Sequence, residues 1–276
     1  MHRAHEMNVL VTGAGRGIGK RLAIGFAQAG ARLGLIARSK SELDLAHLEI
    51  EDRGGVSIRL RADVTDSENV AAAVERFRVH YGTPDVVICA AALQGPIGPF
   101  LQSTPKQWAE TVNTNLFGVT NICRVVLPYM VERRSGKIIV LAGRGATHAR
   151  PNFSAYSASK AAVVRLVETL ADELLDHNVQ INCIAPGGTY TAMTDEVLRA
   201  GDEAGWREVE EAENLRQTGG ISPDKQIQLA LFLASEQSNH ITGKLIHVND
   251  DWKKLKTASM APDAYTLRRV THKRNE

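Results

Sequence analysis

The sequence has few cysteines, and they are widely spaced. Cys89, Cys123 and Cys183 are the three cysteines in 276 residues, and each lies within an apolar segment. Such an odd, scattered set offers neither a disulfide framework nor the close ligand spacing of a metal site. We therefore expect buried thiols, a reducing compartment and no bound metal.

Net charge is also nearly absent. The 33 basic and 31 acidic residues leave a formal net charge of +2 at pH 7. This balance provides no overall field for holding a polyanion, so we expect no nucleic-acid partner. A local basic group near the end of the chain is interpreted as a solvated terminus, and it comprises Arg268, Arg269, Lys273 and Arg274.

No run of apolar residues reaches the length of about 18 that a membrane-spanning helix requires. The first residues, MHRAHEMNVLVTG, also lack the long apolar stretch and small-residue cleavage site of a secretory signal. With 43% apolar and 23% charged residues, the composition is that of an ordinary globular protein. We expect no membrane partner and a cytoplasmic location.

The sequence does contain a regular alternation of short β-branched runs with longer helical patterns. This alternation is typical of βαβ units around a parallel sheet. Most of the runs are apolar throughout, as in strands that are covered on both faces. Seven strands are expected, at residues 8–11, 32–37, 57–60, 86–89, 137–141, 180–184 and 245–248.

Several helices begin with recognisable capping residues. Hydroxyl side chains accept hydrogen bonds from the free N–H groups of a first turn, and proline fits that turn without loss. The expected pairs are Ser39 with Glu42, Thr65 with Glu68, Thr104 with Pro105, and Ser222 with Pro223. No linker interrupts the pattern, so we expect one domain over residues 1–276, with a core at about 8–248 and a C-terminal extension at 249–276.

A glycine-rich turn follows the first expected strand directly. The segment from Thr12 to Gly19 contains Gly13, Gly17 and Gly19, and it leads through Ile18 into an amphipathic helix. Glycines permit a tight turn and a close approach to a pyrophosphate, and a helix N-terminus offers unpaired N–H groups. A strand, turn and helix in this order predict a dinucleotide site.

The end of the second strand indicates which dinucleotide binds. An acidic residue there would hold the ribose hydroxyls of NAD, but this sequence has Arg38 followed by Ser39. Arg38 can pair with a 2′-phosphate, and Arg16 in the glycine turn can reach the same group. We therefore expect NADP(H) rather than NAD(H), with Ser39 among the cofactor contacts. The alternative is that either arginine simply points to solvent.

A tyrosine and a lysine lie one helical turn apart after the fifth strand. Tyr156 and Lys160 open a helix and fall on one face of it. A phenol has a pKa of about 10, and a neighbouring ammonium favours the phenolate. Tyr156 can therefore act as the acid/base toward a substrate oxygen, with Lys160 as its electrostatic partner.

These motifs together resemble the short-chain dehydrogenase/reductase family. The resemblance rests on the Gly-x-x-x-Gly-x-Gly spacing and on Tyr-x-x-x-Lys within Ser-Ala-Tyr-Ser-Ala-Ser-Lys-Ala-Ala, and it covers about residues 8–248. It implies a doubly wound α/β Rossmann fold, with a seven-stranded parallel sheet and helices on both faces. It also implies an oxidoreductase that transfers hydride between a nicotinamide and a carbonyl or secondary alcohol.

The resemblance assigns further roles. Asp63 and Val64 would line the adenine pocket, although Asp63 also suits a loop near the next helix cap. Asn115, with Asn113 as the competing position, would hold a water in a proton relay through the lysine. Pro186, Gly187 and Thr191 would lie beside the nicotinamide, with Thr191 bonded to its carboxamide.

One catalytic position departs from the family. Its serine lies thirteen residues before the tyrosine, and that position is Gly143 here. Loss of such a donor can cost about a hundredfold in rate. Either Arg144 or Thr147 replaces the serine, or a hydroxylated, sugar-like substrate supplies its own hydroxyl. The third possibility is a non-catalytic NADP(H)-binding sensor or scaffold.

The rest of the chain says less. The stretch Met193–Gly220 is either a lid or an exposed helical hairpin without a catalytic part. Trp252, Tyr265 and Leu267 suggest that the extension docks on the body or on a partner subunit. Family analogy gives a homodimer or homotetramer acting on a small carbonyl or alcohol.

Overall fold

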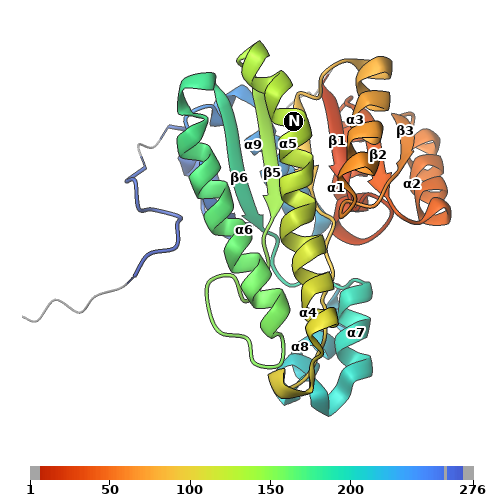
Figure 1. Ribbon diagram of the computed structural model, residues 1–276, viewed down its shortest axis with the longest axis vertical. Coiled ribbons are helices and arrows are strands. Elements are labelled where there is room, and N and C mark those ends of the chain that lie inside the picture. Colours follow the sequence, from red (N-terminus) through yellow and green to blue (C-terminus); the bar gives the residue numbers. More distant parts are fainter. Residues whose placement is uncertain (1–6, 258–259, 270–276) are drawn as a thin grey trace, which may run out of the picture.

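The computed structural model describes residues 7–257 and 260–269. Its centre is a seven-stranded sheet in the order β3-β2-β1-β4-β5-β6-β7, parallel throughout (Figure 1). The strands are β1 (Asn8–Thr12), β2 (Arg32–Ala37), β3 (Val56–Arg61), β4 (Val86–Cys89), β5 (Gly136–Leu141), β6 (Val179–Ala185) and β7 (Leu245–His247). All seven predicted strands are present, with ends that agree to within one residue.

The strand order creates the place where a ligand can bind. The chain adds β2 and β3 on one side of β1, and then returns to lay β4 and the later strands on the other side. The crossover connections therefore leave β1 and β4 in opposite directions. In sheets of this kind ligands bind beyond the carboxyl ends of the strands at such a switch point.

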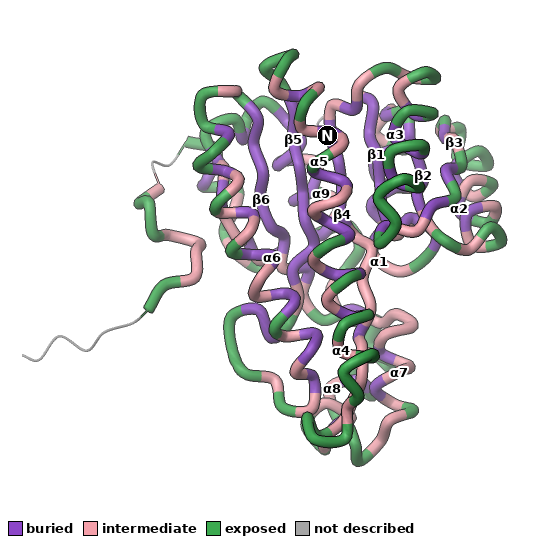
Figure 2. Tube along the Cα trace, in the orientation of Figure 1, coloured by how far each residue is buried: buried purple, intermediate pink, exposed green. Residues whose placement is uncertain are grey.

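Helices cover both faces of the sheet, as predicted. One face packs against α1 (Gly17–Gln28), α2 (Lys40–Asp52) and α9 (Pro223–Ala234). The other face packs against α3 (Ser67–Tyr81), α5 (Gly118–Arg133) and α6 (Ser154–Glu173). Every residue of β1, β4 and β5 is buried, which explains why these strands are mostly apolar (Figure 2).

Three of the four predicted helix starts have the expected caps. The Ser39 hydroxyl accepts from the N–H of Glu42 at 3.2 Å, and Ser222 accepts from the N–H of Asp224 at 3.3 Å. Thr104 caps α4 (Pro105–Val112) in a complete capping box with Gln107. These caps fix where the chain turns from loop to helix.

The prediction that Thr65 caps the third helix is wrong. Asp66 is the N-cap of α3, and its Oδ1 accepts from the N–H groups of Glu68 and Asn69 at 3.0 Å each. A carboxylate at this position is also stabilised by the positive end of the helix dipole. The Thr65 hydroxyl instead donates to Oδ1 of Asp63 at 2.8 Å.

A smaller helical layer lies beyond the carboxyl ends of the strands. It contains α4, α7 (Ala192–Ala200) and α8 (Trp206–Thr218), at the bottom of Figure 1. The shorter helices are η1 (Phe100–Gln102), η2 (Asn113–Phe117), η3 (Leu175–His177), η4 (Gly201–Glu203), η5 (Glu236–Ser238) and η6 (Trp252–Lys256). None of the helices in the described part of the chain has the length and apolar character needed to cross a membrane.

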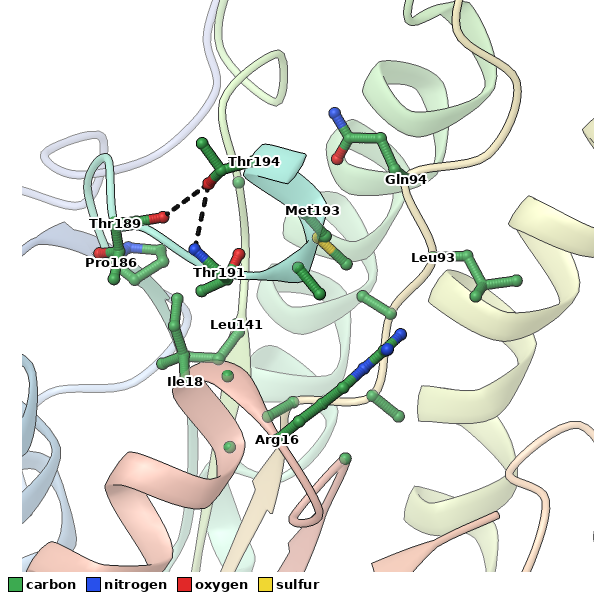
Figure 3. Close-up of a pocket in the computed structure, with 18 of the residues that line it drawn as sticks. Arg16, Ile18, Leu93, Gln94, Leu141, Pro186, Thr189, Thr191, Met193 and Thr194 are labelled. Carbon is green, nitrogen blue, oxygen red and sulfur yellow. Dashed lines mark hydrogen bonds between the residues drawn. The ribbon is translucent and has the colours of Figure 1, made fainter. Parts of the chain in front are cut away.

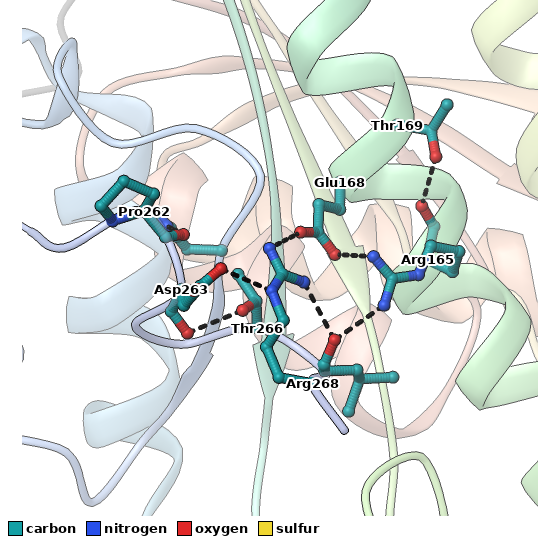
Figure 4. Close-up of polar contacts among 9 residues, drawn as sticks. Arg165, Glu168, Thr169, Pro262, Asp263, Thr266 and Arg268 are labelled. Atoms are coloured by element: carbon teal, nitrogen blue, oxygen red, sulfur yellow. Dashed lines mark hydrogen bonds and ion pairs between the residues drawn. The ribbon is translucent and has the colours of Figure 1, made fainter. Parts of the chain in front are cut away.

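The described part of the C-terminal extension docks on the body. The Trp252 ring stacks on Phe232 with centroids 5.2 Å apart, and the carbonyl of Tyr265 accepts from the N–H of Leu245 at the outer edge of β7. Arg268 pairs with both Glu168 and Asp263 (Figure 4). The basic tail is thus partly engaged, whereas Lys273 and Arg274 lie outside the described residues.

Candidate active site

A cavity of about 1050 Å³ opens beyond the carboxyl ends of the central strands. It gathers residues from both halves of the chain, including nearly all of the predicted site residues. Those that line it are Gly13, Arg16, Gly17, Ile18, Gly19, Arg38, Ser39, Asp63, Val64, Gly143, Arg144, Thr147, Tyr156, Lys160, Pro186, Gly187 and Thr191. Asn115 is the predicted residue that does not line it.

The glycine turn is shaped for close backbone approach. Gly13 has a φ of +65°, and a Cβ there would lie 2.7 Å from the backbone nitrogen of Ala91. A Cβ on Gly19 would collide with the backbone of Gly13. The hydroxyl of Thr12 accepts from the N–H groups of Ala90 and Ala91, and so joins the ends of β1 and β4.

The helix after the turn begins without a side-chain cap. Arg16 is the N-cap of α1, and among the described residues no side chain accepts a hydrogen bond there. The first turn also contains no acidic residue. Its N–H groups therefore remain free for an anionic ligand, which a pyrophosphate would supply.

The two predicted phosphate-binding arginines are exposed at the mouth of the cavity. Arg16 lies 3.7 Å from a carboxylate oxygen of Glu42, and Arg38 lies 3.7 Å from one of Asp63. Both guanidinium groups are more than half exposed, so these long ion pairs are weak. In Figure 3 Arg16 projects away from Ile18. Either arginine can turn toward a phosphate at small cost.

The loop after β6 forms another wall. Gly187 has a φ of +71°, and the carbonyl of Pro186 accepts from the side-chain amide of Gln226 at 2.9 Å. The N–H of Thr191 donates to Oγ1 of Thr194 at 3.1 Å, and that hydroxyl donates to the Thr189 carbonyl (Figure 3). These bonds fix the start of α7 against the cavity.

Tyr156 and Lys160 lie on the buried face of α6 and reach the same cavity. Tyr156 is 8% exposed and Lys160 is 3% exposed. Nζ of Lys160 donates to the carbonyl of Leu141 at 2.8 Å and lies 5.8 Å from the centroid of the tyrosine ring. Burial lowers the pKa of Lys160 to about 8. Burial raises the pKa of Tyr156, and the charge of Arg150 opposes this rise.

Asn115 is buried next to the cavity but does not line it. Asn115 is fully buried in η2, a π-helical turn, whereas Asn113 in the same turn is exposed. Its Oδ1 accepts from the N–H of Leu93 at 2.7 Å, and its Nδ2 donates to the Leu93 carbonyl and to Oγ of Ser159. The side chain thus ties the segment after β4 to α6, beside Lys160.

Gly143 lies against the tyrosine. A Cβ added at this position would clash with the Tyr156 hydroxyl and would lie 3.0 Å from its ring carbon Cζ. As the two residues lie, Tyr156 occupies the space into which a serine side chain would project. A serine at this position would therefore require Tyr156 to move.

The proposed serine replacements have other partners. Arg144 pairs with Glu211 and lies 3.8 Å from Glu208, both on α8. Thr147 is exposed and its hydroxyl lies 3.1 Å from Nδ1 of His148. Both residues line the cavity, but the polar groups that engage them lie on α8 and in the loop itself rather than on Tyr156.

A polar group on the side proposed for the substrate is formed by Gln94, Arg150 and Glu208, and sequence reasoning singled out none of the three. Nε and Nη2 of Arg150 donate to Oε2 of Glu208 at 3.1 and 2.8 Å. These residues lie far apart in the chain, and no local motif marks them. Helix α8 contributes Glu208 and Glu211 to the cavity, so part of Met193–Gly220 lines the site, and a role of this stretch as a lid stays a prediction.

Comparison with known proteins gives a consistent result. The sequence model of the family described as short chain dehydrogenase matches residues 7–201. The chain is 32% identical over 240 residues to a 3-oxoacyl-[acyl-carrier-protein] reductase, FabG, of Thermotoga maritima, which covers 87% of this chain and 95% of that protein. It is 34% identical over 239 residues to the oxidoreductase UcpA of Salmonella typhimurium, covering 85% and 89% of the two chains.

Solved structures extend this likeness to three dimensions. A variant of actinorhodin polyketide ketoreductase, solved with NADPH, superposes with a TM-score of 0.81 at 26% identity. The match covers 88% of this chain and 95% of the ketoreductase. These similar proteins are therefore oxidoreductases, and the ketoreductase has the same arrangement of strands and helices.

Proposed function

The chain belongs to the short-chain dehydrogenase/reductase family, and on that premise we propose that it is an NADP(H)-dependent reductase of a carbonyl compound. The observation that carries the proposal is one cavity that joins the glycine turn to Tyr156 and Lys160. NADPH, when bound, supplies the hydride. The residues that would hold it are the glycine turn, Arg16, Arg38, Ser39, Asp63, Val64, Pro186, Gly187 and Thr191.

The residues of the cavity fit this cofactor. The glycines leave room that a Cβ would fill, the N-terminus of α1 is uncapped, and two exposed cations lie at the mouth. The structure solved with NADPH belongs to a protein of the same fold. An arginine at the end of β2 supports NADP(H) over NAD(H).

Tyr156 would move the proton. Its hydroxyl lies in the cavity wall, where it can donate to the oxygen of a carbonyl substrate. Lys160, held by the Leu141 carbonyl, keeps a positive charge near the ring below its pKa of about 8. Asn115 would hold α6 in place through its hydrogen bond to Ser159. Its expected role in holding a water of a proton relay stays a prediction.

The lining on the far side of Tyr156 is polar. Gln94, Arg144, Thr147, Glu208 and Glu211 offer hydrogen-bond donors and acceptors, and each cation there is paired with a carboxylate. This setting supports a hydroxylated, uncharged carbonyl substrate, which could also supply the hydroxyl that Gly143 lacks. A non-catalytic binding role has no support from the relatives, which are named as reductases and oxidoreductases.

The first test is cofactor binding, which is measured by fluorescence titration of the purified protein with NADPH and with NADH. We expect tight NADPH binding in the wild type and a loss of about tenfold to a hundredfold in Arg38→Asp, because charge-assisted hydrogen bonds to the phosphate contribute about 1.5–3 kcal/mol. NADH affinity should change less. Failure of both nucleotides to bind would remove the basis of the proposal.

Turnover is the second test. The probe substrate is a 3-oxoacyl thioester, chosen because a relative is named for reducing such a group. Tyr156→Phe should lower kcat by at least about a hundredfold while NADPH still binds. Equal turnover by the variant would contradict the assigned role.

The cytoplasmic location and the homodimer or homotetramer remain predictions. The relatives support an enzyme that works on small molecules. Light scattering of the full chain would measure the oligomeric state directly, and a monomer would contradict the expectation.

A further inference from the structure

Arg150 is a nearly buried cation beside the proposed catalytic tyrosine. It lies in the loop between β5 and α6, and its side chain is 9% exposed. Its Cζ lies 3.7 Å from the ring centroid of Phe153 and 5.6 Å from that of Tyr156. A cation is attracted to the face of an aromatic ring, and the attraction grows when water is excluded.

Two other segments hold this guanidinium in place. Glu208 of α8 accepts from Nε and Nη2. The amide oxygen of Gln94, in the orientation that satisfies its surroundings, accepts from Nη1 and Nη2 at 3.2 Å each. Gln94 is 4% exposed, so these contacts are shielded from water. Arg150 thus connects the segment after β4, the loop before α6, and α8.

Building on the proposed reductase chemistry, we propose that Arg150 is a positioning residue for Tyr156. Its fixed cation holds the ring against Gly143 and favours the phenolate that forms when the tyrosine gives up its proton. The family's serine is absent, so a group from outside the usual motif orients the tyrosine. Glu208 and Gln94 are the residues that keep Arg150 in position.

Arg150 differs from the other cation near the Tyr156 ring in how firmly it keeps its charge. Lys160 is the other cation at the ring, and its Nζ is directed to the Leu141 carbonyl. Its pKa of about 8 means that it loses charge in mildly alkaline solution, whereas an arginine remains charged. Cys89 and Cys183 lie near the lysine and are neutral thiols because burial raises their pKa values.

The remaining charged groups lie on α8 and on the same loop. Glu208 faces Arg150 and offsets part of its charge, and Arg144 pairs with Glu211 farther out. Arg150 and Arg144 both pair with carboxylates of α8, but among the described residues of this loop only Arg150 has its cation over the Tyr156 ring. This difference provides a matched control.

The first test titrates Tyr156 without any ligand. The ultraviolet absorbance of tyrosinate is followed against pH for each protein, and the curve of the matching Tyr156→Phe variant is subtracted to isolate one of the five tyrosines. Arg150→Gln should raise the midpoint of Tyr156 by about one pH unit, as expected for a lost opposite charge at this distance. Arg144→Gln should leave that midpoint unchanged.

The second test uses turnover of the 3-oxoacyl thioester probe with NADPH. In Arg150→Gln kcat should fall about tenfold, with a smaller change in KM, and the alkaline limb of the rate profile should move upward by the same shift as the titration. In Arg150→Lys the alkaline limb should return close to its wild-type pH, because the lysine restores the positive charge. NADPH affinity should stay within about twofold in each variant, since the guanidinium does not touch the glycine turn.

A reversed pair separates charge from structure. Arg150→Glu combined with Glu208→Arg keeps the ion pair to α8 but places a carboxylate beside Tyr156. The titration midpoint of Tyr156 should therefore rise further than in Arg150→Gln, even if the double variant is as stable as the wild type. A midpoint that returns to the wild-type value in this variant would overturn the proposal. So would an Arg150→Gln titration that matches Arg144→Gln.

The two proposals fail in distinguishable ways. If Tyr156→Phe reduces the probe as fast as the wild type, the proposed function fails whatever Arg150 does. If Tyr156→Phe is inactive while Arg150→Gln keeps the wild-type midpoint and kcat, only the role of Arg150 is overturned.

Discussion

Gly143 and Tyr156 pack against each other so closely that any side chain at position 143 must move the tyrosine. A glycine in the place of the family's serine is therefore more than a lost hydroxyl. It allows the phenol to lie against the backbone at the end of β5. The position of the proposed proton donor depends on the absence of one carbon atom.

Gly143→Ala should consequently lower kcat for the thioester probe by about a hundredfold, because displacement of a catalytic group by about 1 Å can have that effect. NADPH affinity should be unchanged, since the glycine turn is remote. In a Tyr156→Phe background the same substitution should cost less thermal stability, as the clashing hydroxyl is gone. Faster turnover in Gly143→Ala would show that Tyr156 is poorly placed in the wild type.

Lys137 is a second buried lysine, far from the chemistry. Its Nζ donates to Ser238 and Asn239, and burial lowers its pKa from 10.5 to about 8. Below pH 8 the lysine is charged in both the folded and unfolded states, so the folded state bears the full desolvation cost. Between pH 8 and 10.5 the folded protein has released the proton while the unfolded chain retains it, and the cost disappears.

The unfolding free energy of the wild type should therefore rise relative to Lys137→Met as the pH increases from about 7 to about 10.5, by up to about 3 kcal/mol. Urea unfolding of the two proteins at matched pH values measures this difference. Subtracting the unfolding free energy of Lys137→Met from that of the wild type removes the contributions of the cysteines and tyrosines, which both proteins share. A difference that stays constant with pH would contradict the lowered pKa.

Single helices depend on short-range contacts that can be tested separately. Asp66 accepts two hydrogen bonds at the start of α3, whereas the Thr65 hydroxyl is engaged by Asp63. Asp66→Ala should lower the unfolding free energy by about 1 kcal/mol, and Thr65→Ala should lower it by clearly less. Chemical denaturation of the two variants measures both values. The reverse order would restore Thr65 as the cap.

The elements are predictable where local pattern determines them. Most strands can be found because burial on both faces makes them largely apolar, and Thr104 and Ser222 cap as expected because proline follows each one. The cap of α3 is ambiguous because two acceptors stand side by side, and the choice depends on geometry. Sequence pattern alone does not distinguish Thr65 from Asp66.

The candidate site is predictable only in part, for the same reason. The glycine turn, Tyr156 and Lys160 are motifs with fixed spacing, and the cavity contains them. Arg150, Gln94 and Glu208 meet through the fold from three distant segments, so no spacing records their contact. The side chains that surround a reaction are less visible in a sequence than those that define its family.

At the scale of the whole molecule, the C-terminal segment fastens the outer edge of the sheet. Arg268 links Asp263 in that segment to Glu168 on α6 (Figure 4). The Tyr265 carbonyl accepts a hydrogen bond from the N–H of Leu245 in β7. The body and this segment should therefore unfold together. A single cooperative transition would also support the predicted one-domain organisation.

Arg268→Ala should lower the midpoint of thermal unfolding only slightly, because its ion pairs are partly exposed to solvent. Arg269→Ala, an exposed neighbour, is the matched control and should have almost no effect. The effect of Arg268 should shrink in about 1 M salt, where screening is strong. Equal effects of the two substitutions in thermal unfolding would argue against the fastening role.

The cavity draws its two ends from different parts of the chain. The proposed nucleotide residues lie in the first 64 positions and at 186–191, whereas the proposed substrate side is formed by Gln94, the loop before α6 and α8. The family match ends at residue 201, before α8 begins. Exchanging α8 with that of a relative could therefore redirect the enzyme to another substrate while its nucleotide preference is inherited unchanged. Lineages of such proteins can diversify by altering one late segment.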